Sequence, residues 1–334
     1  MFSPWRSPLP VVADYNNSGR GAEQLRGRRA ARSIIKGHKL RNREPLVKIH
    51  IDCIPCYFRQ ALQAARFATD EQTLWWRTMS EIAAFVRTAG PHMQSHDAAE
   101  TVHRIIREAT SCPDPYARVK TEYTRRALEM LPDARRRVLA APDPLDAAVR
   151  MGIAGNVIDF GSQAFLDLDE TVEKILDVPF AIDHRVDFFA QLHAARTVLL
   201  LADNAGEIVF DTLLLEQLRD KRLVVCVRGA PILNDATRED ALASGLHELA
   251  EITDTGHACP GIPLERMSAD FLDLFHSADI IIAKGQANFE SLCEQDRVNL
   301  FLLFTTKCRL VGARTGTQIG DIMLIRSDKL KTGS

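Results

Sequence analysis

The spacing of apolar residues gives the N-terminal half of the chain a helical character. Between residues 46 and 180, apolar side chains recur every three or four positions in segments such as CYFRQALQAARFA, TLWWRTMSEIAAFVRTA and AETVHRIIREAT. That spacing places them on one face of a helix. Pro and Gly separate these segments, and no long stretch alternates as a half-buried strand does. The pattern predicts a helical N-terminal region.

From about residue 195 the pattern changes to short, continuous apolar runs rich in Val, Ile and Leu. Four such runs are TVLLLAD, RLVVCVR, DIIIAK and LFLLFTT, and helical stretches such as FDTLLLEQLRD and SADFLDLFHS lie between them. Buried strands that alternate with helices are typical of a parallel sheet covered on both faces. We therefore predict an α/β fold with a mainly parallel sheet, to which a later run, IMLIR, adds an edge strand.

These patterns divide the chain into three predicted segments. We predict a basic, disordered extension over residues 1–45, a helical domain over 46–185, and an α/β/α catalytic and metal-binding domain over 186–334. The extension has a composition that rarely folds alone. Because it is rich in Arg and poor in acidic residues, it could also be a nucleic-acid-binding arm or a targeting segment.

The charge distribution argues against nucleic acid as a partner. Residues 1–43 hold ten Lys and Arg against only Asp14 and Glu23, whereas the whole chain has 42 basic and 44 acidic residues. The remainder therefore carries an excess of ten acidic side chains, which disfavours contact with phosphate backbones. No apolar run approaches the roughly 18 residues that a membrane helix needs. We expect a cytoplasmic protein that binds neither nucleic acid nor membranes.

Polar and charged residues follow each of the four predicted strands. The runs end in Asp203-Asn204-Ala205-Gly206-Glu207, Arg228-Gly229, Lys284-Gly285-Gln286-Ala287-Asn288 and Thr305-Thr306-Lys307. Ligands of parallel α/β sheets bind at the carboxyl ends of strands. Carboxylate and amide oxygens suit Mg²⁺, and neighbouring cations offset the charge of a phosphate. The next segment offers Asp235 as a third oxygen ligand, although Asp235 could instead cap the helix in ATREDALASG.

The pair Cys53 and Cys56, in the sequence CIPC, is a possible second metal or redox site. The proline between them suits a first helical turn, and a thiol at a helix N-terminus has a lowered pKa. The pair could be half of a metal site, a redox couple or simple packing. A zinc site needs two more ligands, for which the candidates are Cys308, His257 and Cys259.

The ordered string of motifs resembles the DUF89 family. DNAGEIVFD, RGAPILNDAT, KGQANFESL and TTKC look like the damage-control phosphatases related to the acidic-residue methyltransferase 1 proteins. IDCIPCYFRQAL, DPYARVK and GNVIDFG resemble the prokaryotic branch that carries a CxxC motif. The resemblance covers about residues 47–326. It implies a helical region packed on a Rossmann-like three-layer α/β/α domain, and metal-dependent hydrolysis of small phosphorylated metabolites such as sugar phosphates.

Residue by residue, the resemblance implies a role for each strand-end side chain. A divalent ion such as Mg²⁺, Mn²⁺, Ni²⁺ or Co²⁺ would be bound by Asp203, Asn204 and Asp235. Catalysis would involve Asp203, Asn204, Lys284 and Lys307, and substrate binding would involve Glu207, Arg228, Asn288, Lys284 and Lys307. Arg228 stands where the family usually has Lys, and an Arg retains the charge and can bind phosphate in a bidentate fork. Either Asp203 or a metal-bound water would attack phosphorus.

Two other functions are compatible with a Rossmann-like sheet. The first is an S-adenosylmethionine-dependent methyltransferase, although VLLLADNAGE lacks the Gly-rich turn that lets a nucleotide cofactor approach the first strand. The second is a protein that binds a phosphorylated ligand without turnover. Assays of phosphate release and of methyl transfer separate these functions from a phosphatase.

Overall fold

The computed structural model describes residues 48–155 and 177–330. The predicted extension over residues 1–45 lies outside this range, as does the GNVIDFG motif beyond its first residue. The chain from Leu46 to Ser334 forms one compact unit. Within the described range, no helix has the length and apolar character that crossing a membrane would require.

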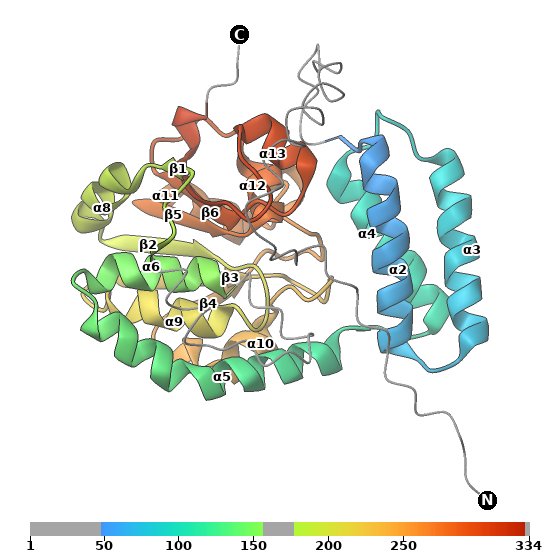
Figure 1. Cartoon of the computed structure of the whole chain (residues 1–334), viewed down its shortest axis with the longest axis horizontal. Helices are drawn as coiled ribbons and strands as arrows, with labels where there is room; N and C mark the ends of the chain where they lie inside the picture. The colour runs from blue at the N-terminus through green and yellow to red at the C-terminus, as the bar shows by residue number, and fades with distance from the viewer. Residues whose placement is uncertain (1–47, 156–176, 331–334) are drawn as a thin grey trace, which may run out of the picture. The chain divides into compact units, whose positions relative to one another are not determined.

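The first three long helices pack side by side around a core of their own (Figure 1). They are α2 (Ile54–Ala68), α3 (Gln72–Thr88) and α4 (Ser95–Thr110). Their apolar positions at helical spacing, among them Ala61, Ile82, Val102 and Ile106, are fully buried. The predicted helical N-terminal region is confirmed, and we call α2–α4 the helical bundle.

Within the described residues, seven strands form one sheet in the order β1-β7-β6-β5-β2-β3-β4. Neighbouring strands are parallel except β6 and β7, which are antiparallel. The predicted mainly parallel α/β fold is confirmed. The strands are β1 (Ile182–Asp183), β2 (Thr197–Leu201), β3 (Arg222–Val227), β4 (Glu251–Asp254), β5 (Ile280–Lys284), β6 (Leu300–Thr305) and β7 (Ile322–Arg326).

Both edges of the sheet differ from the sequence prediction. The run IMLIR is β7, but the predicted edge position is wrong, because β1 pairs with its outer side. β1 has only two residues, too few to produce a hydrophobic pattern. At the other edge, β4 has the sequence EITD, in which only one residue is strongly apolar. A short strand at an edge is paired on one side only, so it needs no continuous apolar run.

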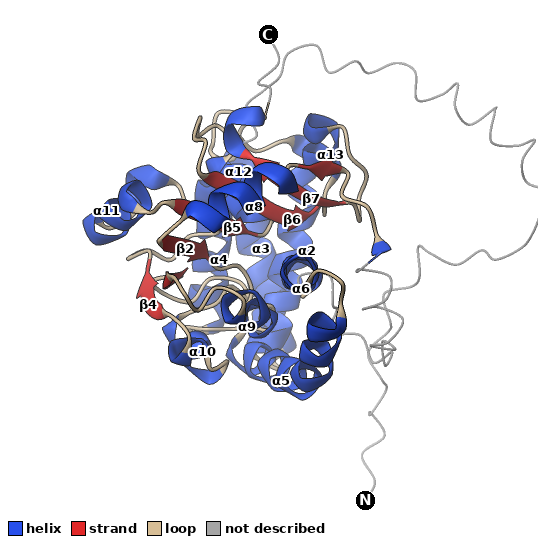
Figure 2. Cartoon of the chain, turned by 90° about the vertical axis from the view of Figure 1, so that its left-hand side faces the viewer, coloured by secondary structure: helices blue, strands red, loops and turns tan. Residues whose placement is uncertain are grey.

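Helices cover both faces of the sheet and complete the three layers (Figure 2). Along β2, Val198 and Leu200 point to one face, while Leu199 and Leu201 point to the other. The first face is covered by α5 (Ala117–Ala140), α6 (Pro144–Ala154), α8 (Arg185–Ala194), α9 (Ile208–Glu216) and α10 (Arg238–Ala243). The second is covered by α11 (Ala269–Ser277), α12 (Gln286–Leu292) and α13 (Arg309–Thr315). Because α5 and α6 pack on the sheet, its covering layer begins in sequence well before residue 186.

Candidate active site

The loop after β2 and the segment before α10 lie against each other at the carboxyl end of the sheet. Asn204 and Asp235 form an isolated antiparallel bridge. The backbone N–H of Ala236 donates to the carbonyl oxygen of Asp203 at 2.7 Å. The structure therefore brings together Asp203, Asn204 and Asp235, the three residues that the sequence proposes as metal ligands.

The side chain of Asp235 is free of the capping role that the sequence left open. The N-cap of α10 is Thr237, which forms a capping box with Asp240. Asp235 instead accepts a hydrogen bond from Arg228, with 2.7 Å between Oδ2 and Nε. Burial raises the pKa of Asp235 to about 6, although the neighbouring positive charge of Arg228 opposes that rise. Asp235 is therefore held by Arg228 and not by the end of a helix.

The amide of Asn204 is oriented by two carboxylates. Its Nδ2 donates to Asp203 Oδ2 at 2.8 Å and to Glu207 Oε2 at 3.1 Å. Since both amide hydrogens point to carboxylates, the amide oxygen Oδ1 is the atom available to a cation. Two carboxylates and one amide oxygen are the donor set that a hard divalent cation prefers.

A glycine makes room for Asp203 between β5 and α12. Gly285 has φ of +83°, and a Cβ atom there would lie 2.0 Å from Asp203 Oδ2. A side chain at this position would therefore both strain the backbone and displace the carboxylate. Residue 285 has to be glycine as long as Asp203 keeps its place.

We expect Gly285→Ala to weaken metal binding at the predicted site by displacing Asp203, and to destabilise the fold by more than the ~1 kcal/mol of an unfavourable backbone conformation. The matched control is Gly316→Ala, at φ of +75° with no atom within 4 Å of the added Cβ. Unfolding in urea and metal titration of both variants would check this. Equal metal affinity in the two variants would contradict the placement of Asp203.

Lys284 is the buried counterion of two carboxylates. Its Nζ donates to Glu207 at 2.7 Å, to Asp211 at 2.6 Å and to the carbonyl oxygen of Gly152 at 2.9 Å. An ammonium group has three N–H donors, and all three are used. This geometry favours a positioning role for Lys284, holding Glu207 beside Asn204, over the predicted contact with phosphate.

Burial sets the pKa values of this network. Burial raises the pKa of Glu207 to about 7, although the positive charge of Lys284 opposes the rise, and burial also raises that of Asp211. Burial alone would lower the pKa of Lys284, but the charges of Asp211 and Glu207 raise it above its ordinary value. The lysine therefore stays charged.

Asp211 is a site residue that the sequence reasoning did not single out. It is fully buried, and its Oδ2 has no hydrogen-bond partner within the described part of the chain. A signal was present: Asp211 is the only acidic residue in the apolar run IVFDTLLL and follows Glu207 by four positions. Residues four apart share one helix face, so both carboxylates can reach one lysine.

The side chains of Arg228 and Asn288 are buried and hydrogen-bonded to each other. The guanidinium Nη2 of Arg228 donates to Asn288 Oδ1 at 2.9 Å. The amide nitrogen of Asn288 donates to backbone carbonyl oxygens, the shortest being that of Lys284 at 2.7 Å. Asn288 thus orients the guanidinium group of Arg228, which in turn orients the carboxylate of Asp235.

Lys307 is the exposed cation of the site. Its side chain lies at the surface after β6, and its backbone N–H donates to Gln286 Oε1 at 2.8 Å. The positive charge of Lys307 lowers the pKa of Asp235, which burial otherwise raises. The structure therefore brings Lys307, unlike Lys284, to the site as a solvent-facing charge.

At the carboxyl end of the sheet, buried carboxyl groups outnumber buried cations among the described residues. The carboxylates of Asp203, Glu207, Asp211 and Asp235 and the cations Lys284 and Arg228 are all at most 6% exposed. Buried charges are costly unless they are paired, and among the described residues these four carboxyl groups share only two buried cations, while the pKa values of Glu207, Asp211 and Asp235 are raised. A divalent cation would stabilise the ionised form of these carboxyl groups, so the residues present fit the predicted metal.

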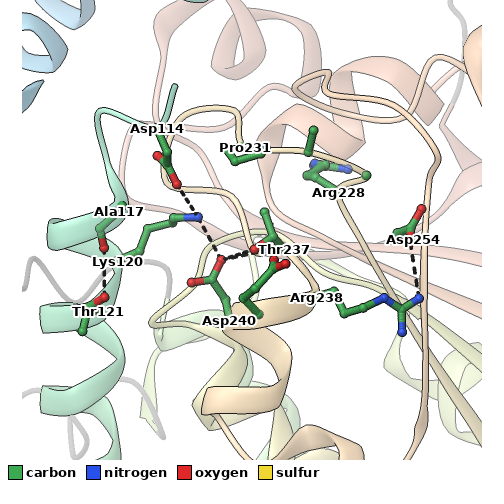
Figure 3. Close-up of a pocket in the computed structure, with 13 residues that line it drawn as sticks. Asp114, Ala117, Lys120, Thr121, Arg228, Pro231, Thr237, Arg238, Asp240 and Asp254 are labelled. Carbon is green, nitrogen blue, oxygen red and sulfur yellow. Dashed lines mark hydrogen bonds and ion pairs between the residues drawn. The ribbon is translucent and has the colours of Figure 1, made fainter. Parts of the chain in front are cut away.

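A cavity of about 550 Å³ opens beside Arg228 (Figure 3). Lys120, from the DPYARVK motif, crosses it to Asp114 at 3.1 Å and to Asp240 at 3.0 Å. Arg238 pairs with Asp254 on the opposite wall. The cavity is lined by Asp114, Ala117, Lys120, Thr121, Arg228, Gly229, Ala230, Pro231, Thr237, Arg238, Glu239, Asp240 and Asp254. Its walls are polar and carry both signs of charge.

The cysteine pair lies elsewhere in the fold. All seven cysteines are free thiols. Cys53 precedes α2 and Cys56 lies in its first turn. Of the candidate additional ligands, Cys308 is the N-cap of α13, where its Sγ accepts from the backbone N–H of Val311 at 3.5 Å. The Nε2 atom of His257 instead lies 3.5 Å from Oε1 of Glu100 on α4.

Comparison with known proteins identifies the family. A family model described as the damage-control phosphatase ARMT1-like domain matches residues 49–323. A protein named damage-control phosphatase PH1575, from Pyrococcus horikoshii, is 30% identical over an alignment of 287 residues, and the match covers 84% of this chain and 99% of that protein. An uncharacterized protein of Methanocaldococcus jannaschii is 35% identical over an alignment of 292 residues, and the match covers 84% of this chain and 96% of the relative.

The fold agrees with a solved relative. The crystal structure of a DUF89 family protein from Pyrococcus horikoshii superposes with a TM-score of 0.77 at 29% identity, and covers 84% of this chain and 99% of that one. The resemblance seen in the motifs is thereby confirmed, and with it a phosphatase of the damage-control type. With residues 49–323 matched by its model, the chain belongs to the damage-control phosphatase ARMT1-like family.

Proposed function

We propose that this chain is a divalent-metal-dependent phosphatase that hydrolyses monoesters of small phosphorylated metabolites, such as sugar phosphates. Asp203, Asn204 and Asp235 hold the ion, which would be Mg²⁺, Mn²⁺, Ni²⁺ or Co²⁺. The observation that supports the proposal is that Asp203, Asn204 and Asp235 lie together at the carboxyl end of the sheet, where buried carboxyl groups outnumber buried cations among the described residues. The cytoplasmic location expected from the sequence is part of the same proposal.

Different residues of the chain would bind the phosphoryl group and position the metal ligands. When bound, the ion would polarise a phosphoryl oxygen as a Lewis acid. Lys307 offsets negative charge on the phosphoryl group, while Arg228 keeps Asp235 ionised and in place. Lys284 positions Glu207, and Asn288 positions Arg228. The mixed-charge cavity beside Arg228 suits a polar leaving group.

A set of parallel assays tests the proposal. Purified full-length chain is treated with a chelator and then assayed for phosphate release from an aryl phosphate, with and without added Mg²⁺ or Mn²⁺. Methyl transfer from S-adenosylmethionine is measured beside it. We expect phosphate release only with metal. Ligand binding without turnover would favour the binding protein, and methyl transfer alone would favour the methyltransferase.

We expect Lys307→Met to lower kcat/KM by about 10²–10³-fold, the usual effect of removing one preorganised charge-stabilising group. Most of the loss should fall on kcat, because charge on the leaving group grows in the transition state. Since Lys307 is exposed, the free energy of unfolding should change by less than about 0.5 kcal/mol. Lys329→Met, in the polar C-terminal segment, is the control. Equal values of kcat and KM in the two variants would show that Lys307 does not act at the site.

A further inference from the structure

Leu233 has a backbone conformation that leucine rarely adopts. Its φ is +50°, in the left-handed region, where the Cβ atom of an L-residue comes too close to a carbonyl oxygen. Among the described residues, Ser111 is the only other non-glycine residue with a positive φ, and it ends α4, where a left-handed residue is common. Leu233 ends no helix. A bulky residue keeps this conformation only when its surroundings hold it there.

The helical bundle provides those surroundings. In sequence, Leu233 belongs to the α/β domain, between β3 and α10. Its side chain nevertheless packs against the hydrophobic core of the helical bundle. Burial of the apolar surface of leucine is favourable, so this contact offsets the unfavourable backbone conformation.

Leu233 is the second residue of the turn that leads to Asp235. The backbone N–H of Asp235 donates to the carbonyl oxygen of Ile232 at 3.1 Å, which closes a four-residue turn. Turns with a positive φ at the second position usually have Gly, Asn or Asp there. A leucine is therefore unfavourable for the turn itself, and its contact with the bundle is what stabilises it at this position.

The turn places the backbone of Asn234 and Asp235 against the loop after β2. The backbone N–H of Ala205 donates to the carbonyl oxygen of Asn234 at 2.9 Å, and Asp235 forms a bridge with Asn204. The direction in which the chain leaves the turn consequently determines where the side chain of Asp235 begins.

We propose that Leu233 is a positioning residue for Asp235. The packing of its side chain on the helical bundle holds the turn in the left-handed conformation, and this conformation places the Asp235 carboxylate for metal binding. The inference rests on the proposed function, in which Asp235 is a metal ligand. It gives the helical bundle a part in metal binding although the bundle contributes none of the three proposed ligands.

The bundle does not depend on Leu233 alone for its contact with the α/β domain. On α4, Glu100 Oε2 accepts from Arg266 Nη1 at 2.7 Å, and Asp97 accepts from Nη2 of the same guanidinium group. Arg266 belongs to η3 (Leu264–Arg266), a short helix of the α/β domain. Truncation of Leu233 should therefore leave the bundle attached and affect mainly the turn.

Three substitutions of Leu233 separate positioning from packing. Leu233→Ala, Leu233→Gly and Leu233→Asn all remove the apolar side chain from the bundle core. Glycine adopts a positive φ without a steric penalty and asparagine tolerates it, whereas alanine does not. We therefore expect the turn to be retained in the Gly and Asn variants and lost in the Ala variant. A role in packing alone predicts the same effect for all three.

Calorimetric titration of the chelator-treated, full-length chain with Mn²⁺ measures the effect without any turnover. We expect Leu233→Ala to raise the Kd for Mn²⁺ about 5–30-fold, because only the fraction of molecules with the left-handed turn binds the ion tightly. Leu233→Gly and Leu233→Asn should remain within about threefold of the wild type. The half-saturating Mn²⁺ concentration for phosphate release should follow the same order.

Two further variants support the interpretation. Met79→Ala, on α3, is the matched control, because Met79 also packs partly buried against the bundle core but lies outside the turn. It should lower the stability of the fold and leave the Kd unchanged. Leu233→Val keeps an apolar side chain, but a β-branched residue disfavours a positive φ. It should raise the Kd, and it replaces Leu233→Ala if circular dichroism shows that variant to be unfolded.

The titration distinguishes a wrong inference from a wrong function. If the wild type binds Mn²⁺ but Leu233→Gly and Leu233→Asn lose as much affinity as Leu233→Ala, or if none of the three loses affinity, Leu233 is not a positioning residue and the metal site stands. If the wild type binds no Mn²⁺, or Asp235→Asn binds it as tightly as the wild type, the proposed metal site is wrong and the positioning role is wrong with it.

Discussion

Replacing Asp203 by asparagine is expected to lower kcat/KM at least about 10³-fold while the fold stays intact. The loss follows because a bound ion contributes several kcal/mol of charge stabilisation in the transition state, and each 1.36 kcal/mol is a factor of ten. Stability should hold or rise, because the substitution removes one negative charge from a group of four buried carboxylates. Steady-state kinetics and urea unfolding measure the two effects.

The control for this variant is Asp273→Asn, on the exposed side of α11. It makes the same chemical change where no cation is expected, so its kinetics should match the wild type. If Asp203→Asn retained wild-type turnover, or lost turnover only because it unfolds, Asp203 could not be assigned as a metal ligand.

Lys284→Met should destabilise the chain by about 3–5 kcal/mol, the usual cost of leaving buried partners of an ion pair without their counterion. Lys284 is 1% exposed and contacts both Glu207 and Asp211. Adding Asp211→Asn should restore part of the stability, because it removes one uncompensated charge. Lys329→Met, near the surface, should change the free energy of unfolding by less than about 1 kcal/mol.

The loss of folding stability in Lys284→Met, relative to the wild type, should depend on pH. The pKa of Glu207 is about 7 in the folded chain, above its ordinary value of 4.5. Stability associated with the protonated carboxyl is thus fully present below pH 4.5 and is lost as pH rises through about 7. Without Lys284 the folded pKa of Glu207 rises further while its unfolded pKa is unchanged, so the loss of stability relative to the wild type should grow as pH rises above about 7. A stable variant with a pH-independent deficit would contradict the counterion role.

The sequence predicts the fold well where burial is strong. β2, β3, β5 and β6 are buried between helical layers, so continuous apolar runs identify them. The same reasoning cannot find β1, which has two residues, or β4, which is polar and lies at an edge. It also assigns α5 to the helical domain, because an amphipathic pattern identifies a helix but not the surface it covers.

The candidate site shows a similar limit. Polar residues at strand ends indicate which side chains gather at one edge, as Asp203, Asn204 and Asp235 do. Spacing does not distinguish a lysine that faces solvent from one that is buried, yet Lys307 is exposed and Lys284 is not. That difference depends on the carbonyl of Gly152 and on Asp211, which approach from α6 and α9. Only the folded arrangement shows these contacts.

The most direct test of the account is phosphate release by the chelator-treated chain as a function of added Mg²⁺ or Mn²⁺, measured for the wild type and for Asp235→Asn. The account predicts no turnover without metal, saturable restoration in the wild type, and half-saturation at a much higher metal concentration in the variant. Turnover that needs no metal, or the same half-saturating concentration in both chains, would contradict it.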